Sequence, residues 1–147
     1  FNGTVILSGS IGDGYSVASS LALGADFAYM GTRFIATKEA NADQSYKEML
    51  IKSAADDIVY SNLFTGVSGN YLKPSIRNAG LDPDNLPEAD KTAMNFGSGG
   101  NTDAKAWKDI WGSGQGIGGI KDDPSVEELV ERIIEEYNQA KKEFNER

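Results

Sequence analysis

Cysteine and histidine are both absent from the 147 residues of the chain, and each absence removes a class of chemistry. Without cysteine the chain forms no disulfide and offers no thiolate nucleophile, as is common in the cytoplasm. Without histidine it lacks the side chain that most often acts as a general base near neutral pH or binds a transition metal. We therefore assign no catalytic residue and no metal ligand to this chain. Any proton transfer within it falls to Asp, Glu, Lys or Tyr.

Basic residues are also scarce, because 14 Lys and Arg stand against 22 Asp and Glu for a formal net charge of −8. No segment is rich in Lys or Arg, so we expect no nucleic-acid partner. No apolar run approaches the roughly 18 residues that a membrane-spanning helix needs, which predicts no membrane partner and a soluble, cytoplasmic protein. The chain begins at Phe1 and enters a strand-like run at once, so we expect further chain upstream.

Residues 1–40 follow a strand, turn, helix, strand pattern that is typical of a parallel βαβ unit. The apolar run 4–8 predicts the first strand, and helical spacing over 17–22 predicts a helix that stops at Gly24. The run 26–31 predicts the second strand. Because both runs are apolar, we expect each strand to be buried on two faces, as parallel strands usually are.

The middle of the chain is less regular. Residues 41–55 predict an amphipathic helix with Lys47 among the charged residues away from its apolar face, and residues 57–64 are compatible with another strand. Residues 65–100 are rich in Gly and Pro, which predicts a long loop region with one helical turn near 71–79. A loop of that length inside a compact domain is more often functional than idle.

The C-terminal helix has the strongest periodic signal. We place Asp123 at its N-cap and Pro124 at its first helical position. Its apolar stripe repeats at helical spacing along one face and requires a packing partner. The residues of that stripe are Val126, Leu129, Val130, Ile133, Ile134 and Tyr137.

A glycine-rich turn at residues 9–14 lies between the first strand and its helix, so its backbone N–H groups can face an anion with the helix dipole behind them. The second strand ends in Gly31, Thr32 and Arg33, and phosphates in (β/α)₈ barrels commonly lie between two such strand ends. The turn matches neither the dinucleotide nor the Walker pattern. The alternatives that stay open are a purely structural turn and an ion pair at Arg33.

Several motifs at these spacings resemble the nitronate monooxygenase family, also called the 2-nitropropane dioxygenase family. The resemblance covers nearly the whole chain, and its specificity lies in the combination of the pieces. These are Ser8-Gly9-Ser10-Ile11-Gly12-Asp13-Gly14, Leu21-Ala22-Leu23-Gly24-Ala25-Asp26, Met30-Gly31-Thr32-Arg33-Phe34-Ile35-Ala36-Thr37-Lys38-Glu39, Phe64-Thr65-Gly66, Lys73-Pro74-Ser75-Ile76-Arg77-Asn78 and Trp111-Gly112-Ser113-Gly114-Gln115-Gly116-Ile117-Gly118.

The resemblance implies an FMN-dependent TIM-barrel enzyme that oxidises alkyl nitronates with O₂. The chain would form an α/β fold, the last two βα units of a (β/α)₈ barrel with a mainly helical and irregular C-terminal extension. Its implied parts are residues 1–40 with the FMN-phosphate site, residues 41–120 as a helical and loop insertion on the substrate side, and residues 121–147 as the C-terminal helix.

The resemblance also implies which residues bind the cofactor. Gln115 would approach the flavin or the substrate, unless its loop is only a flexible connection. The other implied FMN-binding residues hold the phosphate, and they are Gly9, Ser10, Tyr29, Met30, Gly31 and Thr32. The implied partners are an alkyl nitronate, O₂ and either the remainder of the barrel or another copy of the chain, because two βα units cannot close a barrel.

Three departures from the family pattern leave alternatives open. Ser10 stands where many relatives have glycine, Tyr29 stands where glutamine is common, and the family's catalytic histidine is missing. One alternative is the FMN-dependent enoyl-acyl-carrier-protein reductase group, which shares the strand end at residues 31–34 and a Lys-Glu-x-Asn motif, here at 38–41. Another alternative is a truncated, non-catalytic flavin-binding or scaffold fragment.

Overall fold

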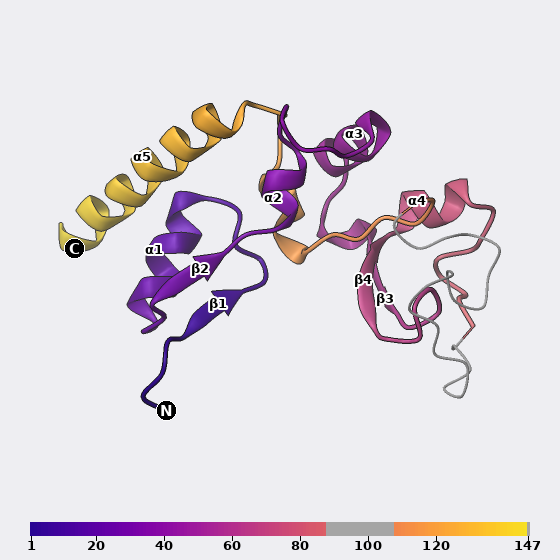
Figure 1. The fold of residues 1–147 in the computed structure, drawn as a ribbon, viewed down its shortest axis with the longest axis horizontal. Helices are drawn as coiled ribbons and strands as arrows, with labels where there is room; N and C mark the ends of the chain where they lie inside the picture. Colours follow the sequence, from indigo (N-terminus) through magenta and orange to yellow (C-terminus); the bar gives the residue numbers. More distant parts are fainter. Residues whose placement is uncertain (88–107, 147) are drawn as a thin grey trace. The chain divides into compact units, whose positions relative to one another are not determined.

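The structure, a computed structural model, describes residues 1–87 and 108–146 and divides the chain into two compact units. The first unit comprises Phe1–Lys52 and Gln115–Arg147, and the second comprises Ser53–Gly114. In chain order (Figure 1) the elements are β1 (Ile6–Ser8), α1 (Gly14–Ala22), β2 (Phe27–Tyr29), α2 (Thr32–Ile35), α3 (Gln44–Lys52), the 3-10 helix η1 (Ala55–Asp57), β3 (Ile58–Ser61), β4 (Gly69–Leu72), α4 (Lys73–Asn78), the 3-10 helix η2 (Gln115–Gly119) and α5 (Val126–Asn145).

The first unit opens with the predicted parallel βαβ arrangement. Strands β1 and β2 pair in parallel, with Ile6 opposite Phe27 and Ser8 opposite Tyr29. Helix α1 connects them and ends just before Gly24, whose positive φ of 93° suits a glycine after a helix. The sequence therefore predicted the order, the direction and the helix stop correctly.

The expectation that both strands are buried on two faces is wrong for this chain. The exposed fractions of Ile6, Phe27 and Tyr29 are 58%, 60% and 63%. Burial on both faces requires a packed layer on each side of the sheet. Within the described residues, the sheet contains two strands, and α1 is the helix that packs against β2. The apolar composition thus predicts that the strand faces should be buried, but it does not show whether another element covers them in this structure.

Helices α1 and α5 pack side by side in the first unit, although they come from opposite ends of the chain (Figure 1). At their crossing, a Cβ atom on Gly14 would overlap the carbonyl oxygen of Ile133 and the backbone nitrogen of Tyr137. Glycine is therefore required at position 14 by the close approach of two backbones. Along the predicted apolar stripe of α5, Leu129 is only 1% exposed, whereas Val130 and Ile134 remain 39% and 53% exposed.

Helix α5 starts two residues later than the predicted cap at Asp123 and Pro124. Its N-cap is Ser125, whose hydroxyl accepts the N–H of Glu128 at 3.1 Å while the Glu128 carboxylate accepts the N–H of Ser125 at 2.7 Å. This reciprocal capping box satisfies two helix-end donors at once, which a lone Asp-Pro signal does not. The carbonyl of Pro124 instead accepts the N–H of Lys38.

Helix α3 also corrects one prediction. Lys47, expected on the solvated face, is only 5% exposed. Its ammonium donates to the carbonyl oxygens of Thr37 at 2.7 Å and Lys38 at 3.4 Å, both beyond the end of α2. A buried lysine is tolerable where its charge is hydrogen-bonded, so Lys47 fastens α3 to the segment that follows α2.

The second unit contains an antiparallel hairpin. Strand β3 lies within residues 57–64, where the sequence was compatible with a strand, whereas β4 lies where it predicted a long loop. Strand β3 pairs with β4, from Ile58 opposite Leu72 to Ser61 opposite Gly69. Residues 110–113 then lie along β4, where Leu72 donates to the carbonyl of Trp111 at 2.8 Å. Helix α4 confirms the predicted helical turn. The part of the predicted irregular segment beyond residue 87 lies outside the described residues.

An apolar cluster forms the core of the second unit. Phe64 and Tyr71 meet edge to face with ring centroids 4.9 Å apart, and Phe64 is fully buried. The buried members of this cluster are Leu63, Phe64, Tyr71, Ile76 and Ile110. Across the described residues, no helix is both long and apolar enough to span a bilayer.

Candidate functional site

The candidate site lies at the carboxyl edge of the β1–β2 sheet. Ser8 and Tyr29 are opposite each other at the last pair of the parallel register, so Gly9 and Met30 leave the sheet side by side. Neighbouring strands lie about 4.8 Å apart, which places the two strand ends within reach of one small ligand. All seven predicted cofactor residues belong to the first unit, and six of them lie at this edge.

The backbone of the turn after β1 has an unusual conformation. Gly9 and Ser10 have consecutive positive φ values of 97° and 56°, and Ser10 is the single non-glycine residue with positive φ among the described residues. A left-handed serine costs roughly 1–2 kcal/mol, and such strain clusters at functional sites. An added Cβ at Gly9, or at Gly31 on the neighbouring strand end, meets no atom within 4 Å. The two strand ends therefore leave open space beside the glycine backbone.

Gln115 lies beside this turn although it is distant in sequence. It is the exposed first residue of η2, and the next residue, Gly116, packs against the turn. A Cβ on Gly116 would lie 3.0 Å from the carbonyl carbon and oxygen of Ser10. Glycine at position 116 thus lets η2 contact the Ser10 backbone. The structure thus places the two strand ends side by side and η2 against the turn after the first of them, and the binding role of these residues stays a prediction.

Two amides at the start of α1 are already hydrogen-bonded within the chain, which limits what this helix end could offer an anion. The first amides of α1 already have acceptors: Asp13 accepts the N–H of Ser16 at 2.7 Å, and the Glu136 carboxylate of α5 accepts that of Gly14 at 2.8 Å. These two carboxylates take the places that an external anion would need. The strand end at Gly31 instead leads into the short helix α2, where Gly31 O accepts the N–H of Phe34 at 3.0 Å.

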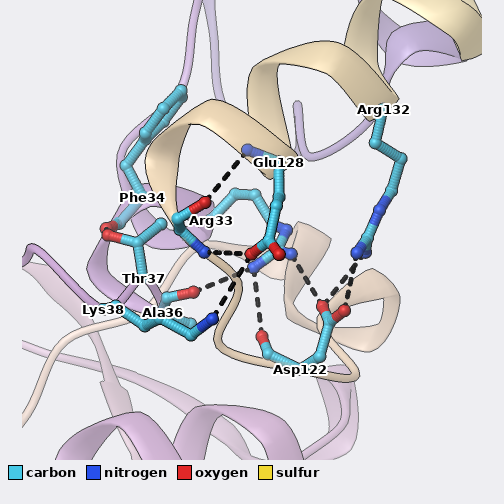
Figure 2. A network of polar contacts seen from close by, with 9 residues as sticks. Arg33, Phe34, Ala36, Thr37, Lys38, Asp122, Glu128 and Arg132 are labelled. Carbon is cyan, nitrogen blue, oxygen red and sulfur yellow. Dashed lines mark hydrogen bonds and ion pairs between the residues drawn. The ribbon is translucent and has the colours of Figure 1, made fainter.

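Arg33 forms the inter-element ion pair that the sequence left as one of two alternatives. Its side chain is 4% exposed, and it donates to Asp122 Oδ1 at 2.9 Å, to Asp122 O at 3.3 Å and to Ala36 O at 3.1 Å. Figure 2 shows the guanidinium enclosed by these acceptors. With its donors committed to protein oxygens, Arg33 is a structural residue of the site rather than a ligand contact.

Asp122 also binds a second arginine. Arg132 of α5 donates to both carboxylate oxygens of Asp122, at 3.1 and 2.7 Å (Figure 2). The hydrogen bond from Arg132, reinforced by the charges of both arginines, holds the pKa of Asp122 below its usual value. Burial lowers the pKa of Arg33, an effect that Asp122 opposes, and arginine remains charged at any physiological pH. We call Arg33, Asp122 and Arg132 the arginine–aspartate cluster.

The Lys-Glu motif after α2 holds the start of α5. Both carboxylate oxygens of Glu39 accept the N–H of Val126, at 3.0 and 2.9 Å, and Lys38 pairs with Glu128 at 3.4 Å. An anionic cap at a helix N-terminus needs no ligand to explain it. The motif shared with the enoyl reductase group therefore has a structural role here and does not separate the two chemistries.

Sequence reasoning missed three residues that shape this site. Asp122 and Glu136 are charged residues in polar surroundings along the chain, and nothing local indicates that each reaches an element about 90 or more positions away. Gly116 is one of five glycines within residues 112–119, and the sequence does not tell which glycine makes a close contact. The reciprocal Ser-x-x-Glu spacing at Ser125 was the one visible signal that went unused.

Comparison with known proteins gives the family. The sequence model described as nitronate monooxygenase matches residues 4–136, and the chain belongs to this family. A nitronate monooxygenase of Paraburkholderia phytofirmans is 35% identical over 79 residues, which is 54% of this chain and 22% of the relative.

Two solved structures resemble nearly the whole chain. Nitroalkane oxidase from Streptomyces ansochromogenes has a TM-score of 0.73 at 25% identity and covers 98% of this chain and 42% of its own. A single-residue variant of FabK from Thermotoga maritima has a TM-score of 0.70 at 25% identity and covers 99% and 44%. The chain has a mixed α/β fold, and these structural neighbours are TIM-barrel proteins. The chain spans less than half the length of these relatives.

Proposed function

We propose that this chain supplies the FMN-phosphate edge of a flavin-dependent enzyme that oxidises alkyl nitronates with O₂, as the last two βα units of a (β/α)₈ barrel. One observation carries the proposal: the parallel register of β1 and β2 brings the left-handed Gly9-Ser10 turn beside Gly31, with open space next to both glycines. Membership in the nitronate monooxygenase family supports the flavin and the oxidative chemistry.

Different residues of this edge would contact different parts of FMN. Backbone N–H groups of Gly9, Ser10, Gly31 and Thr32 donate to the phosphate, since the two strand ends converge there. The substitution of glycine by Ser10 keeps the backbone donor and the left-handed conformation. Gln115, the exposed first residue of η2, would approach the ring system or the substrate.

Tyr29 and Met30 form the rest of the edge. Tyr29 is 63% exposed at the end of β2, so its ring lies where a glutamine is common in relatives, and Met30 lines the strand end beside Gly9. Bound FMN would supply the electron-transfer chemistry. The general base comes from the remainder of the barrel or from another copy, because this chain contains no histidine.

A titration with FMN tests the phosphate site, with riboflavin as the ligand that lacks phosphate. We expect flavin fluorescence to report binding of FMN at least about tenfold tighter than binding of riboflavin, since a charge-assisted phosphate contact is worth about 1.5–3 kcal/mol. Equal affinity for the two flavins, or binding of neither, would contradict the proposal.

Gly31→Ala is the matched variant for this titration. Its added Cβ meets no protein atom, and its φ of −111° is open to alanine, so the fold should not change. The methyl group points into the space assigned to the phosphate. We expect FMN affinity to fall about tenfold while riboflavin affinity and the unfolding midpoint stay unchanged.

A second candidate function is a flavin-binding fragment that acts only by association. The exposed apolar residues Ile6, Phe27 and Tyr29 of the two-stranded sheet favour it, because such a surface requires a partner. Oxygen uptake with an alkyl nitronate, compared with oxidation of a reduced nicotinamide, separates the monooxygenase from both this fragment and the enoyl reductase alternative.

A further inference from the structure

Asp122 joins two elements of the first unit and lies in a third segment between them. Its carboxylate and carbonyl bind Arg33 of α2, and its two carboxylate oxygens bind Arg132 of α5. Asp122 itself lies three residues beyond the end of η2. One side chain thus fixes the spacing between α2, the segment after η2, and α5 (Figure 2).

Helix α2 and the segment that contains Asp122 each adjoin residues of the proposed phosphate site. Arg33 follows Thr32 directly, and the Arg33 guanidinium also closes α2 through Ala36 O. On the other side, the Asp122 segment continues back through η2 to Gly116, which abuts Ser10. The contacts therefore form a ring from the first strand end, through η2 and Asp122, to the second strand end.

We propose that Asp122 is a positioning residue, which sets the register of the Gln115 loop and of the α2 start around the site without touching the cofactor. This inference rests on the proposed function for the identity of the ligand, FMN. The register itself is a property of the chain without ligand.

The negative charge of Asp122, and not only its size, is required to neutralise the two arginines of the arginine–aspartate cluster. Arg33 is almost fully buried, so it depends on its protein acceptors for neutralisation. Asn at position 122 keeps the size but leaves two guanidiniums close together without their shared counterion. Glu136 acts on both arginines through its charge but accepts the Gly14 N–H in the structure. The expected response is separation of α2 from the segment after η2.

Hydrogen exchange of the chain without flavin tests the register directly. Asp122→Asn should speed exchange of amides at Gly31–Ala36 and Gln115–Asp122 by about tenfold, while the amides of α4 in the second unit keep their rates. Asp123→Asn is the matched control, because Asp123 is the neighbouring acid and makes no ion pair within the described part of the chain. It should change neither segment.

Flavin titration of the same variants connects the register to the site. Asp122→Asn should lower the ratio of FMN to riboflavin affinity at least about fivefold, and Asp123→Asn should leave that ratio unchanged. A wild-type chain that does not prefer FMN to riboflavin contradicts the proposed function alone, and the exchange pattern then decides the positioning role.

Arg33→Lys keeps the experiment decisive if Asp122→Asn fails to fold. Lysine keeps the charge but loses the forked donor geometry that reaches Asp122 and Ala36 together. It should speed exchange in the same two segments by about threefold. Unchanged exchange in both segments, in whichever of the two variants folds, would overturn the proposal, as would a uniform increase across the first unit.

Discussion

Each of the two units of the chain is stabilised internally by its own combination of contacts. In the unit Ser53–Gly114, Phe64, Tyr71 and Ile76 pack into a contiguous apolar core around a hairpin. The other unit also buries apolar side chains, among them Leu50, Ile117 and Leu129. In addition, ion pairs and helix caps join its segments near residues 33–39 and 122–132, while its apolar strands β1 and β2 remain exposed. Apolar burial is non-directional, whereas caps and ion pairs depend on geometry.

This difference bears on the proposed function, because binding a phosphate depends more on the fixed positions of hydrogen-bond donors than on burial of the site. Polar contacts with defined distances hold backbone donors in place, and they do so where the sheet itself is short. Each of the three substitutions below is expected to affect mainly one of the two units.

The largest effect is expected from Phe64→Ala in the apolar core. Removing a fully buried ring leaves a cavity, which typically costs about 3–5 kcal/mol. Chemical denaturation followed by tryptophan fluorescence measures it, since both tryptophans lie between Ser53 and Gly114. Tyr60→Ala, on the same hairpin but 70% exposed, should cost under about 1 kcal/mol. If Phe64→Ala also abolished the helical circular dichroism of α5, the two units would share one cooperative core.

Gly14→Ala should give the next largest effect and alter only the other unit. The added methyl group overlaps the backbone of α5 at Ile133 and Tyr137, and overpacking of this kind costs about 2–3 kcal/mol. Alanine otherwise favours a helix over glycine, so the sign of the change is informative. Thermal unfolding by circular dichroism measures it, with Gly118→Ala as the control, because a Cβ there meets no atom. A Gly14→Ala variant as stable as wild type would disprove the close crossing.

Ser125→Ala should have the smallest effect, a loss of about 1 kcal/mol, because it removes one half of the capping box of α5. Glu39 continues to accept the N–H of Val126, which limits the damage. Hydrogen exchange in the first turn of α5 is the sensitive measurement. Ser68→Ala removes an exposed hydroxyl from the other unit and should change nothing. Faster exchange throughout α5, rather than in its first turn alone, would show that the capping box stabilises the whole helix and not only its N-terminal turn.

Local patterns predicted the elements whose signals agree with one another. The strand, turn, helix and strand of residues 1–40 combine apolar runs with a glycine stop, and their chain order alone implies a parallel pair. Strand β4 was not predicted, because Gly69 and Asn70 disfavour strands and only pairing with β3 and with residues 110–113 selects that conformation. Lys47 was misplaced because its acceptors, the carbonyls beyond α2, leave no trace in sequence.

The candidate site divides in the same way. Two parallel strand ends meet at one edge by topology, so Gly9, Ser10 and Gly31 could be grouped from the sequence. The contact of Gly116 with Ser10 and the sharing of Asp122 by two arginines depend on tertiary packing between distant segments. The sequence alone does not distinguish the acidic residues that form ion pairs, such as Asp122, from those that remain solvated.

The cap that Glu136 provides to Gly14 links two residues separated by 122 positions. During synthesis from the N-terminus, the Gly14 N–H therefore lacks this acceptor until residue 136 has been made. Closing so long a loop is slow and entropically costly, so contacts of this kind form late in folding. The glycine-rich turn that precedes α1 would then reach its final conformation only when α5 packs against α1. The candidate site at the carboxyl edge of the β1–β2 sheet would therefore form late in folding.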